Sequence, residues 1–156
     1  MHKGTNSCNA DCEGGDRRRL FLYKVVMEKP KSFRLPSTQL SGDGLRWVAA
    51  CGVTGIKSVV IPIVVGKAKA TEKLYTVRLY FTEPDEIGPG ERVFDVEIQG
   101  NKAIQNLDIA KESGGSRRLL LKELRGVKSD STLSISFVPN IGRTQISGVE
   151  IVAEVN

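Results

Sequence analysis

The sequence predicts an all-β protein, an antiparallel two-sheet β-sandwich of the jelly-roll type. Two segments in the middle of the chain, 75–81 and 92–98, alternate in character with period two, which is typical of strands with one face on a core. Gly, Pro and Ser interrupt the chain at short intervals, and no long stretch shows the 3.6-residue period of a helix. About eight short strands form two packed layers more readily than one open sheet.

The first part of the chain predicts a leader followed by strands. Residues 1–19 are rich in Gly, Asn, Asp and Arg, which predicts a flexible leader before a single domain spanning 20–156. The strands expected before the central pair lie at 21–27, 45–51 and 58–65, with a turn at 41–44 and a basic loop at 66–73. Pro30 and Pro36 are expected to end the first strand, because proline cannot donate a ladder hydrogen bond.

The two central segments predict a β-hairpin closed by the turn-rich loop 83–91. If Phe81 pairs with Arg92, the register places apolar residues opposite one another on the buried face: Leu79 with Phe94, Val77 with Val96, and Tyr75 with Ile98. The same register places Arg78 opposite Asp95 as an ion pair on the solvated face. Phe94 is therefore expected in the core, and Asp95 at the surface.

The C-terminal half predicts further strands separated by turns. Residues 99–102 form a tight turn of the kind that closes hairpins, because Gly and Asn accept positive φ at low cost. Residues 103–109 are expected to be extended, with one helical turn at 107–112 as the alternative. The remaining strands are expected at 117–124, at 132–138 with Leu133, Ile135 and Phe137 on one face, and at 147–155 with Val149, Ile151 and Ala153 on one face.

Composition places limits on the class of protein. The 156 residues, of which 40% are hydrophobic and 26% charged, fit one soluble globular domain. The net charge is +5, but the arginine clusters 17–19 and 117–118 accompany neither a helix nor an aromatic platform, which argues against nucleic-acid binding. The longest apolar run, 59–65, contains Pro62 and is shorter than the ~20 residues of a membrane span. Residues 1–16 lack the pattern of a signal peptide.

Cysteine and histidine usage argues against a metal site or a cofactor. The sequence has three cysteines, and Cys8 and Cys12 lie in the polar leader, where a disulfide between them remains an alternative for an exported protein. Cys51 follows an apolar run and is expected to be buried. The only histidine, His2, adjoins the initiator, so no Cys/His ligand set is present. The acidic loop 83–91 is expected to be solvated, because nothing in the sequence enforces convergence of its carboxylates on a cation.

The central strands and several further motifs resemble a known family. The motifs are Gly42-Asp43-Gly44-Leu45-Arg46-Trp47-Val48, Gly52-Val53-Thr54-Gly55, Gln99-Gly100, Asp108-Ile109, Gly114-Gly115 and Ile146-Ser147-Gly148-Val149-Glu150-Ile151. With Tyr75 to Phe81 and Arg92 to Val96, they resemble the malectin-type carbohydrate-binding module over roughly residues 42–154, closest to its bacterial exported versions. The resemblance implies a galactose-binding-like jelly roll, a non-catalytic role, and an extracellular or cell-envelope location within a larger protein.

The resemblance also indicates where a sugar would bind. In animal malectin two adjacent aromatic residues follow the equivalent of Glu83 and stack on glucose, whereas this chain has Pro84, Asp85 and Glu86 there. An acidic residue before the last strand also contributes in that protein, and here its position falls near Gly142. The candidate carbohydrate-binding residues are Trp47, Tyr80, Glu83, Asp85, Glu86, Asn140 and Arg143. Trp47 and Tyr80 could offer rings to a sugar, and the competing interpretation is packing in the core or under a loop.

The sequence predicts a non-enzyme. No histidine beyond His2 is present to activate a nucleophile, and one acidic loop cannot hold two catalytic carboxylates at a fixed separation. The leading hypothesis is a module that binds an oligosaccharide or polysaccharide through the loops around Trp47, 83–90 and 140–144. The alternative is a structural or protein-interaction jelly roll without a sugar site, which contacts other domains of a larger protein. A third hypothesis is electrostatic binding of an acidic polysaccharide, with the contacts Arg117, Arg118, Lys67, Lys69 and Lys73.

Overall fold

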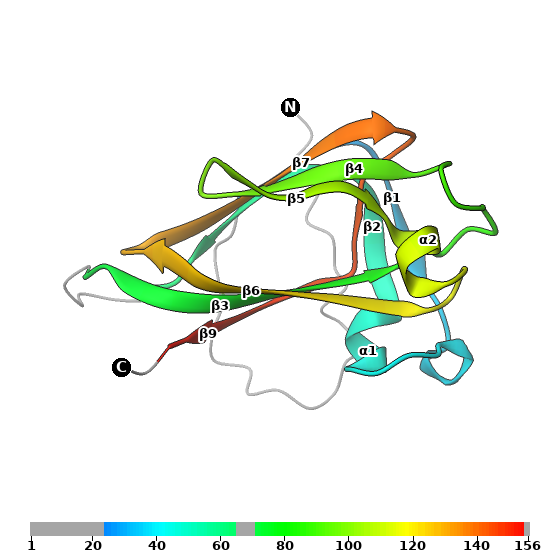
Figure 1. Ribbon diagram of the computed structural model, residues 1–156, viewed down its shortest axis with the longest axis horizontal. Coiled ribbons are helices and arrows are strands. Elements are labelled where there is room, and N and C mark those ends of the chain that lie inside the picture. Colours follow the sequence, from blue (N-terminus) through cyan, green and yellow to red (C-terminus); the bar gives the residue numbers. More distant parts are fainter. Residues whose placement is uncertain (1–23, 65–70, 155–156) are drawn as a thin grey trace.

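The computed structural model describes residues 24–64 and 71–154. The chain forms two sheets that lie face to face, with two short helices at one end (Figure 1). The elements in order are β1 (Lys24–Arg34), η1 (Ser37–Gln39), α1 (Arg46–Ala49), β2 (Cys51–Pro62), β3 (Lys73–Thr82), β4 (Val93–Ile98), β5 (Asn101–Asp108), α2 (Ile109–Ser113), β6 (Leu119–Ser129), β7 (Thr132–Ile141), β8 (Gln145–Ile146) and β9 (Gly148–Ala153).

The sheets confirm the predicted antiparallel two-layer sandwich. The larger sheet has the order β1-β2-β7-β4-β5, with β8 paired to β2, and the smaller has the order β6-β3-β9. Every pairing between these strands is antiparallel. Side chains from the facing surfaces of the two sheets meet in one core.

The core confirms the predicted faces of the central strands but not their pairing. Leu79 and Phe81 of β3 and Phe94 of β4 are fully buried. The rings of Phe81 and Phe94 lie 6.0 Å apart between centroids, yet β3 pairs with β6 and β9 whereas β4 pairs with β5 and β7. The predicted hairpin is therefore wrong: the loop 83–91 carries the chain from one sheet to the other, and the matched apolar faces meet across the sandwich.

The predicted ion pair between Arg78 and Asp95 is wrong for the same reason. The two residues lie on the outer faces of different sheets, and Arg78 instead pairs with Glu123 at 2.7 Å and Glu150 at 3.4 Å on its neighbouring strands. Asp95 pairs with Lys102 of β5 at 3.2 Å.

Asp95 is also buried rather than solvated, with 7% of its surface exposed. Its carboxylate accepts hydrogen bonds from the Asn106 backbone N–H at 2.8 Å and from Asn140 Nδ2 at 2.8 Å. These bonds, the one from Asn106 first, lower the pKa of Asp95 below its usual range. A side chain on an outer sheet face is thus covered by neighbouring polar groups, which alternation alone does not reveal.

The first strand continues past Pro30, contrary to prediction, and ends at Arg34 before Pro36. The pairing with β2 shifts between Met27 and Lys31, so Pro30 lies in a bulge where no ladder N–H is required. Val25 and Met27 pack against the core, as the alternation predicts. The strand expected at 58–65 begins earlier, since β2 spans Cys51–Pro62.

The strand predicted at 45–51 is wrong, because α1 occupies most of it. Val48 of α1 covers the outer face of the smaller sheet, where a Cβ at Gly148 would lie 2.3 Å from Val48 Cγ1. Tyr80, on the same face, is buried with Ala49 in a second apolar cluster. The packing interpretation therefore holds for Tyr80, whereas Trp47 is 62% exposed and does not belong to the core.

Turns and C-terminal strands follow the predictions closely. The turn between β4 and β5 has positive φ at Gln99 (52°) and Gly100 (77°), as a two-residue hairpin turn of type I′ requires. Residues 101–108 are extended and α2 supplies the helical turn directly afterwards. Strands β7 and β9 lie within about three residues of the expected segments, whereas β6 begins two residues later than expected and continues to Ser129. The three inward residues of β7, which are Leu133, Ile135 and Phe137, are buried.

Some predictions fall on residues outside the described ranges. These are the leader 1–19 with His2, Cys8 and Cys12, the start of the first strand, and Lys67 and Lys69 of the basic loop. Cys51 is half-buried rather than buried. Within 24–64 and 71–154, no helix has the length and apolar character needed to cross a membrane.

Candidate functional site

The loops that could bind a ligand gather at one end of the sandwich, which we call the loop end. Strand β3 ends there at Thr82 and β4 begins there at Val93, which pairs with both Asp108 and Ile141. The loop end consists of residues 83–92, the turn after α2 at 114–118, the segment 142–144 and the β1 bulge at 28–30.

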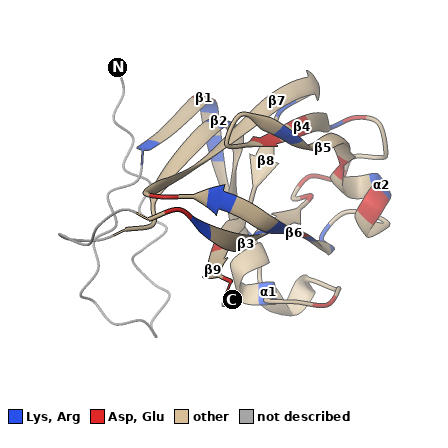
Figure 2. Cartoon of the chain, turned by 60° about the vertical axis from the view of Figure 1, so that its left-hand side comes forward, with Lys and Arg blue, Asp and Glu red and all other residues tan. Residues whose placement is uncertain are grey.

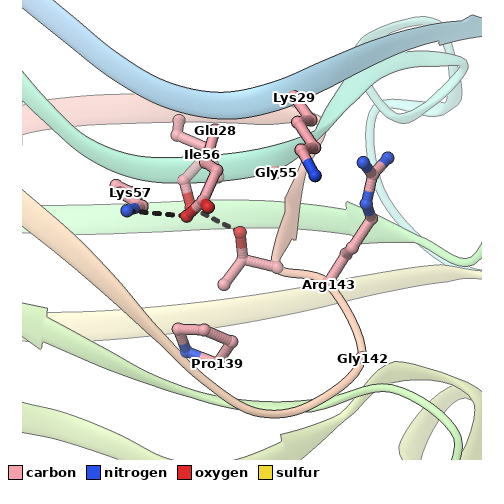
Figure 3. Close-up of a pocket in the computed structure, with 9 residues that line it drawn as sticks. Glu28, Lys29, Gly55, Ile56, Lys57, Pro139, Gly142 and Arg143 are labelled. Carbon is pink, nitrogen blue, oxygen red and sulfur yellow. Dashed lines mark hydrogen bonds and ion pairs between the residues drawn. The ribbon is translucent and has the colours of Figure 1, made fainter.

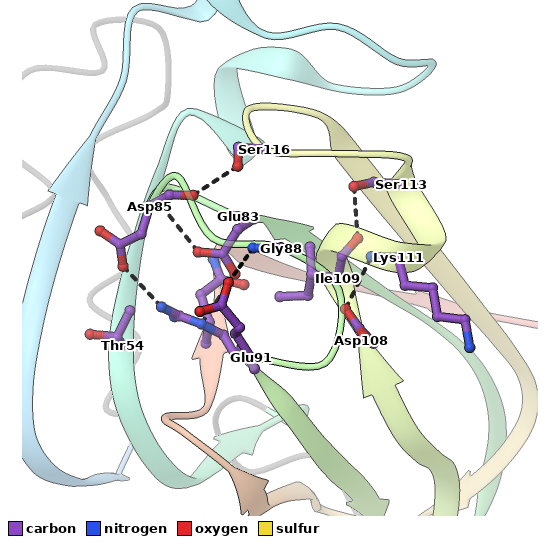
Figure 4. A network of polar contacts seen from close by, with 12 residues as sticks. Thr54, Glu83, Asp85, Gly88, Glu91, Asp108, Ile109, Lys111, Ser113 and Ser116 are labelled. Atoms are coloured by element: carbon purple, nitrogen blue, oxygen red, sulfur yellow. Dashed lines mark hydrogen bonds and ion pairs between the residues drawn. The ribbon is translucent and has the colours of Figure 1, made fainter.

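The loop 83–91 is held by its own polar contacts (Figure 4). The Asp85 backbone N–H donates to Glu83 Oε1 at 3.1 Å, and the Gly88 N–H donates to the Glu91 carboxylate. The Ser116 hydroxyl donates to the Asp85 carbonyl at 2.9 Å, which ties this loop to the turn after α2. The loop is therefore tied to its surroundings, and its acidic side chains at Glu86 and Glu91 are exposed, as the sequence predicts for a solvated loop, whereas Glu83 is buried.

Glu83 and Arg92 form a buried ion pair at the base of the loop. The Glu83 side chain is 0% exposed, and its Oε2 lies 3.1 Å from Arg92 Nε. Arg92 also donates from NH2 to Asp85 Oδ2 at 2.9 Å, and Asp85 is half-exposed. Burial raises the pKa of Glu83 above its usual range, and the opposing attraction of Arg92 only partly offsets it. Glu83 therefore positions the loop and is not accessible to a ligand.

Asp108 joins the loop to α2. Its Oδ1 accepts from the Lys111 N–H at 3.0 Å as the N-cap of α2, and its Oδ2 accepts from the Gly90 N–H at 2.7 Å. Gly114 ends α2 with a φ of 79°, which glycine adopts without the steric cost of a Cβ.

We expect Asp108→Ala to lower the free energy of unfolding by about 1–2 kcal/mol, because both the cap and the tie to Gly90 are lost. Urea denaturation measures this change. Asp108→Asn keeps an acceptor for the cap and should recover about half of the loss. Equal stability of the wild type and the alanine variant would show that Asp108 does not hold the loop.

A pocket of about 220 Å³ opens beside the loop (Figure 3). It lies between the β1 bulge, strand β2 and the segment that follows β7, and its lining residues are Glu28, Lys29, Gly55, Ile56, Lys57, Pro139, Gly142, Arg143 and Thr144. The Gly55 N–H donates to the Thr144 carbonyl at 2.9 Å, and the Thr144 hydroxyl donates to the Ile56 carbonyl. The segment is thereby fixed to β2, and the pocket has a defined shape.

The candidate residues do not form one site. Asp85 lies above the buried Glu83, and the exposed Glu86 pairs with Arg117 NH2 at 3.7 Å on the rim. Arg143 lines the pocket. The side-chain amide of Asn140 donates hydrogen bonds to Asp95 and Asn106 on the outer face of the larger sheet.

The two aromatic candidates lie away from the pocket. Tyr80 is buried on the outer face of the smaller sheet, and its hydroxyl donates to Glu150 Oε2 at 3.0 Å. Burial, with this hydrogen bond, raises the pKa of Tyr80. Trp47 is exposed on α1, and neither ring is among the residues that line the pocket. Ring stacking of the kind found in animal malectin therefore has no counterpart in the pocket.

Charge is distributed over the molecule rather than gathered on one face. Figure 2 shows Lys and Arg on strands of both sheets, and Asp and Glu around α2 and the loop beside it. Lys73 begins β3 and pairs with Ser129. At the other end of β3, Thr82 pairs with Leu119, and Arg117 and Arg118 directly precede Leu119. Of the contacts of the third hypothesis, the three that the structure describes, Lys73, Arg117 and Arg118, thus do not form a single basic patch. In the part of the chain that the structure describes, no group of three or more His, Cys, Asp or Glu side chains is arranged to hold a metal ion.

Sequence reasoning missed the residues that shape the pocket. Lys29 and Lys57 come from β1 and β2, and neither belongs to a motif in the sequence. The sequence could have indicated a special role for Arg92, because this charged residue directly precedes a strand that is apolar on its inner face. Its buried partner Glu83 is separated from it by a loop, so the pair emerges only from the fold.

A protein-family model, the Malectin domain, matches residues 68–153 of the chain. That match covers more than half of the sequence, including both central strands and all later ones.

One sequence relative comes from a plant, and solved structures of similar fold come from a plant and a bacterium. Receptor-like protein 4 from Arabidopsis thaliana is 35% identical over 80 residues, which cover 49% of this chain and 13% of that protein. The solved β-glucuronidase from Bacteroides uniformis has a TM-score of 0.66 at 19% identity, over 84% of this chain and 14% of that one. The ANX2 ectodomain from Arabidopsis thaliana has a TM-score of 0.62 at 16% identity, over 79% of this chain and 39% of that one. The structural likenesses show the fold, and this chain spans only a part of each protein it matches.

Proposed function

Because the chain belongs to the malectin domain family, we propose that it is a non-catalytic glycan-binding module of a larger extracellular or cell-envelope protein. The observation that carries the proposal is the pocket at the loop end, which lies beside the loop that follows β3. Its volume of about 220 Å³ is below the ~300–1,000 Å³ of pockets for drug-sized ligands, which suits one sugar residue of a longer chain. Relatives with ectodomains support the extracellular location. The proposal includes the similarity of this chain to the bacterial exported members of the family.

The pocket would recognise a sugar by polar contacts more than by stacking. Lys29 and Arg143 offer donors for hydroxyl groups, while Ile56 and Pro139 offer apolar surface for the C–H face of a ring. Asp85 and Glu86 on the neighbouring loop would contact the next residue of the glycan. The buried Glu83 would act through Arg92 and Asp85, by holding the loop in position.

A glycan array followed by NMR titration with the best oligosaccharide tests this proposal. We expect amide shift changes at the pocket, centred on Gly55 and residues 142–144, and millimolar or tighter affinity. Trp47→Ala is the matched control, because Trp47 is exposed but lies away from the pocket, and it should change the affinity by less than about twofold. Absence of binding to every neutral and acidic glycan at millimolar concentration would refute the proposal, and loss of binding in Trp47→Ala would move the site to α1.

The exposed apolar side chains of α1 and of its N-cap residue favour a second candidate, a structural or protein-interaction module. Trp47 and Leu45 are 62% and 41% exposed, and neither lies at the pocket. Large exposed apolar residues of this kind mark contact surfaces between proteins or domains. Under this candidate, Trp47→Ser would abolish association with another domain of the parent protein, and no glycan would bind.

A further inference from the structure

We propose that the pocket at the loop end binds an anionic group, and that this group is the carboxylate or sulfate of an acidic saccharide. The saccharide part rests on the proposed function, while the anion part stands on the geometry of the pocket alone. The basic residues proposed here differ from those that the sequence analysis names for an acidic polysaccharide, since Arg117 and Arg118 do not line this pocket.

The pocket carries more positive than negative charge. Three cationic side chains line it, Lys29, Lys57 and Arg143, against one carboxylate, Glu28. Lys57 is neutralised by Glu28 at 2.7 Å. Within residues 24–64 and 71–154, Lys29 and Arg143 form no direct ion pair. Both attract the Glu28 carboxylate from a longer distance, and after the hydrogen bond from Lys57 they help to lower the pKa of Glu28. Figure 3 shows the ends of both side chains on the same side of the pocket. An anion bound in the pocket would be attracted by both cations.

Two glycines allow close approaches of the backbone around the pocket. Lys29 has a φ of 44°, which is uncommon for a residue other than glycine and turns the β1 bulge over β2. Gly55 accepts this approach, because a Cβ there would lie 2.3 Å from the Glu28 carbonyl oxygen. Gly142 has a φ of 68°, and a Cβ there would lie 2.7 Å from the Glu91 carbonyl oxygen. Only glycine at both positions allows the bulge and the 142–144 segment to approach as they do.

The chemistry of the two side chains selects the ligand class. The planar guanidinium of Arg143 matches the geometry of a carboxylate or sulfate in two parallel hydrogen bonds, and the Lys29 ammonium adds a compact charge. Ile56 and Pro139 add apolar surface to the same pocket, against which the ring that carries the anion could lie. A neutral glycan would leave Glu28 as the one carboxylate among the three cations that line the pocket. A uronic acid or a sulfated sugar supplies the counterion on a ring that suits the volume.

The test compares acidic and neutral forms of one saccharide. Isothermal titration with tetragalacturonate and with its methyl ester, at low salt and at ~0.15 M salt, separates the charge from the sugar. We expect the acid to bind the wild type about tenfold more tightly than the ester, with the difference shrinking as salt rises. Lys29→Gln and Arg143→Gln should each remove most of this preference. Arg118→Gln removes the same charge from an exposed arginine outside the pocket and should change it by less than about twofold.

The outcomes separate this inference from the proposed function. Equal affinity for acid and ester, unchanged in Lys29→Gln and Arg143→Gln, would overturn the anion pocket and leave glycan binding intact. Binding of a glutamate tetrapeptide as tightly as the tetragalacturonate would overturn the saccharide as the source of the anion. If neither saccharide binds and inorganic sulfate causes no NMR shift at residues 29, 55 and 142–144, the inference fails, whereas the proposed function fails only if the glycan array also shows no binding.

Discussion

We expect Phe94→Ala to lower the free energy of unfolding by about 3–5 kcal/mol. Phe94 is fully buried, and its ring lies 6.0 Å from that of Phe81 in the opposite sheet and 6.3 Å from that of Phe137 in the neighbouring strand. Truncation removes the apolar contact that joins the two layers and leaves a cavity between them, which the sheets cannot close without shifting strands. The loss is large beside a total stability of ~5–15 kcal/mol for a single domain.

Guanidinium denaturation of Phe94→Ala and Val138→Ala checks this expectation. Val138 lies on β7 next to Phe137 but is 42% exposed, so its truncation should cost about 0.5 kcal/mol or less. Similar midpoints for the two variants would mean that Phe94 does not join the sheets.

Arg92→Leu should destabilise the protein at neutral pH by about 3–5 kcal/mol, because it leaves the buried carboxylate of Glu83 without its cation. The double variant Arg92→Leu, Glu83→Leu removes both charges from the same place. It should recover most of the loss, since a buried ion pair is often no more stable than apolar residues of similar volume.

The pH dependence of Arg92→Leu identifies the charge responsible. The pKa of Glu83 already lies above its ordinary value of 4.5, and removal of Arg92 should raise it further. Between the unfolded and the folded pKa, the folded state retains a proton that the unfolded state has released, so stability falls as pH rises through this interval. The cost of Arg92→Leu should therefore be small near pH 4 and grow toward neutral pH. A cost that stays constant from pH 4 to 8 would show that Glu83 is not the residue affected.

The faces of the strands could be predicted from the sequence, but their partners could not. The alternation in β3 and β4 identified Leu79, Phe81 and Phe94 as buried because side-chain direction is a local property of a strand. Two apolar faces can meet as neighbours in one sheet or across a sandwich, and the alternation is the same in both. The loop 83–91 decides between them, since its contacts with Arg92, Ser116 and Asp108 carry the chain to the other layer.

The candidate site was predicted only in part, for a similar reason. The sequence placed Asp85, Glu86 and Arg143 at the loop end, where the structure also has them. It could not show that Glu83 is buried or that α1 covers Tyr80, because both depend on segments distant in sequence. Lys29 lies at the pocket because of the bulge in β1, and the residue types in the sequence do not predict a bulge at that position.

The two glycines of the pocket separate its shape from its charge. Gly55 and Gly142 determine how closely the surrounding backbone approaches, whereas the charge comes from the exposed side chains of Lys29 and Arg143. Position 29 would accept Asn or Gly with less backbone strain than Lys, because both tolerate its positive φ. Evolution or design could therefore change the ligand of this pocket by exchanging two surface residues, and the sandwich beneath would not need to repack.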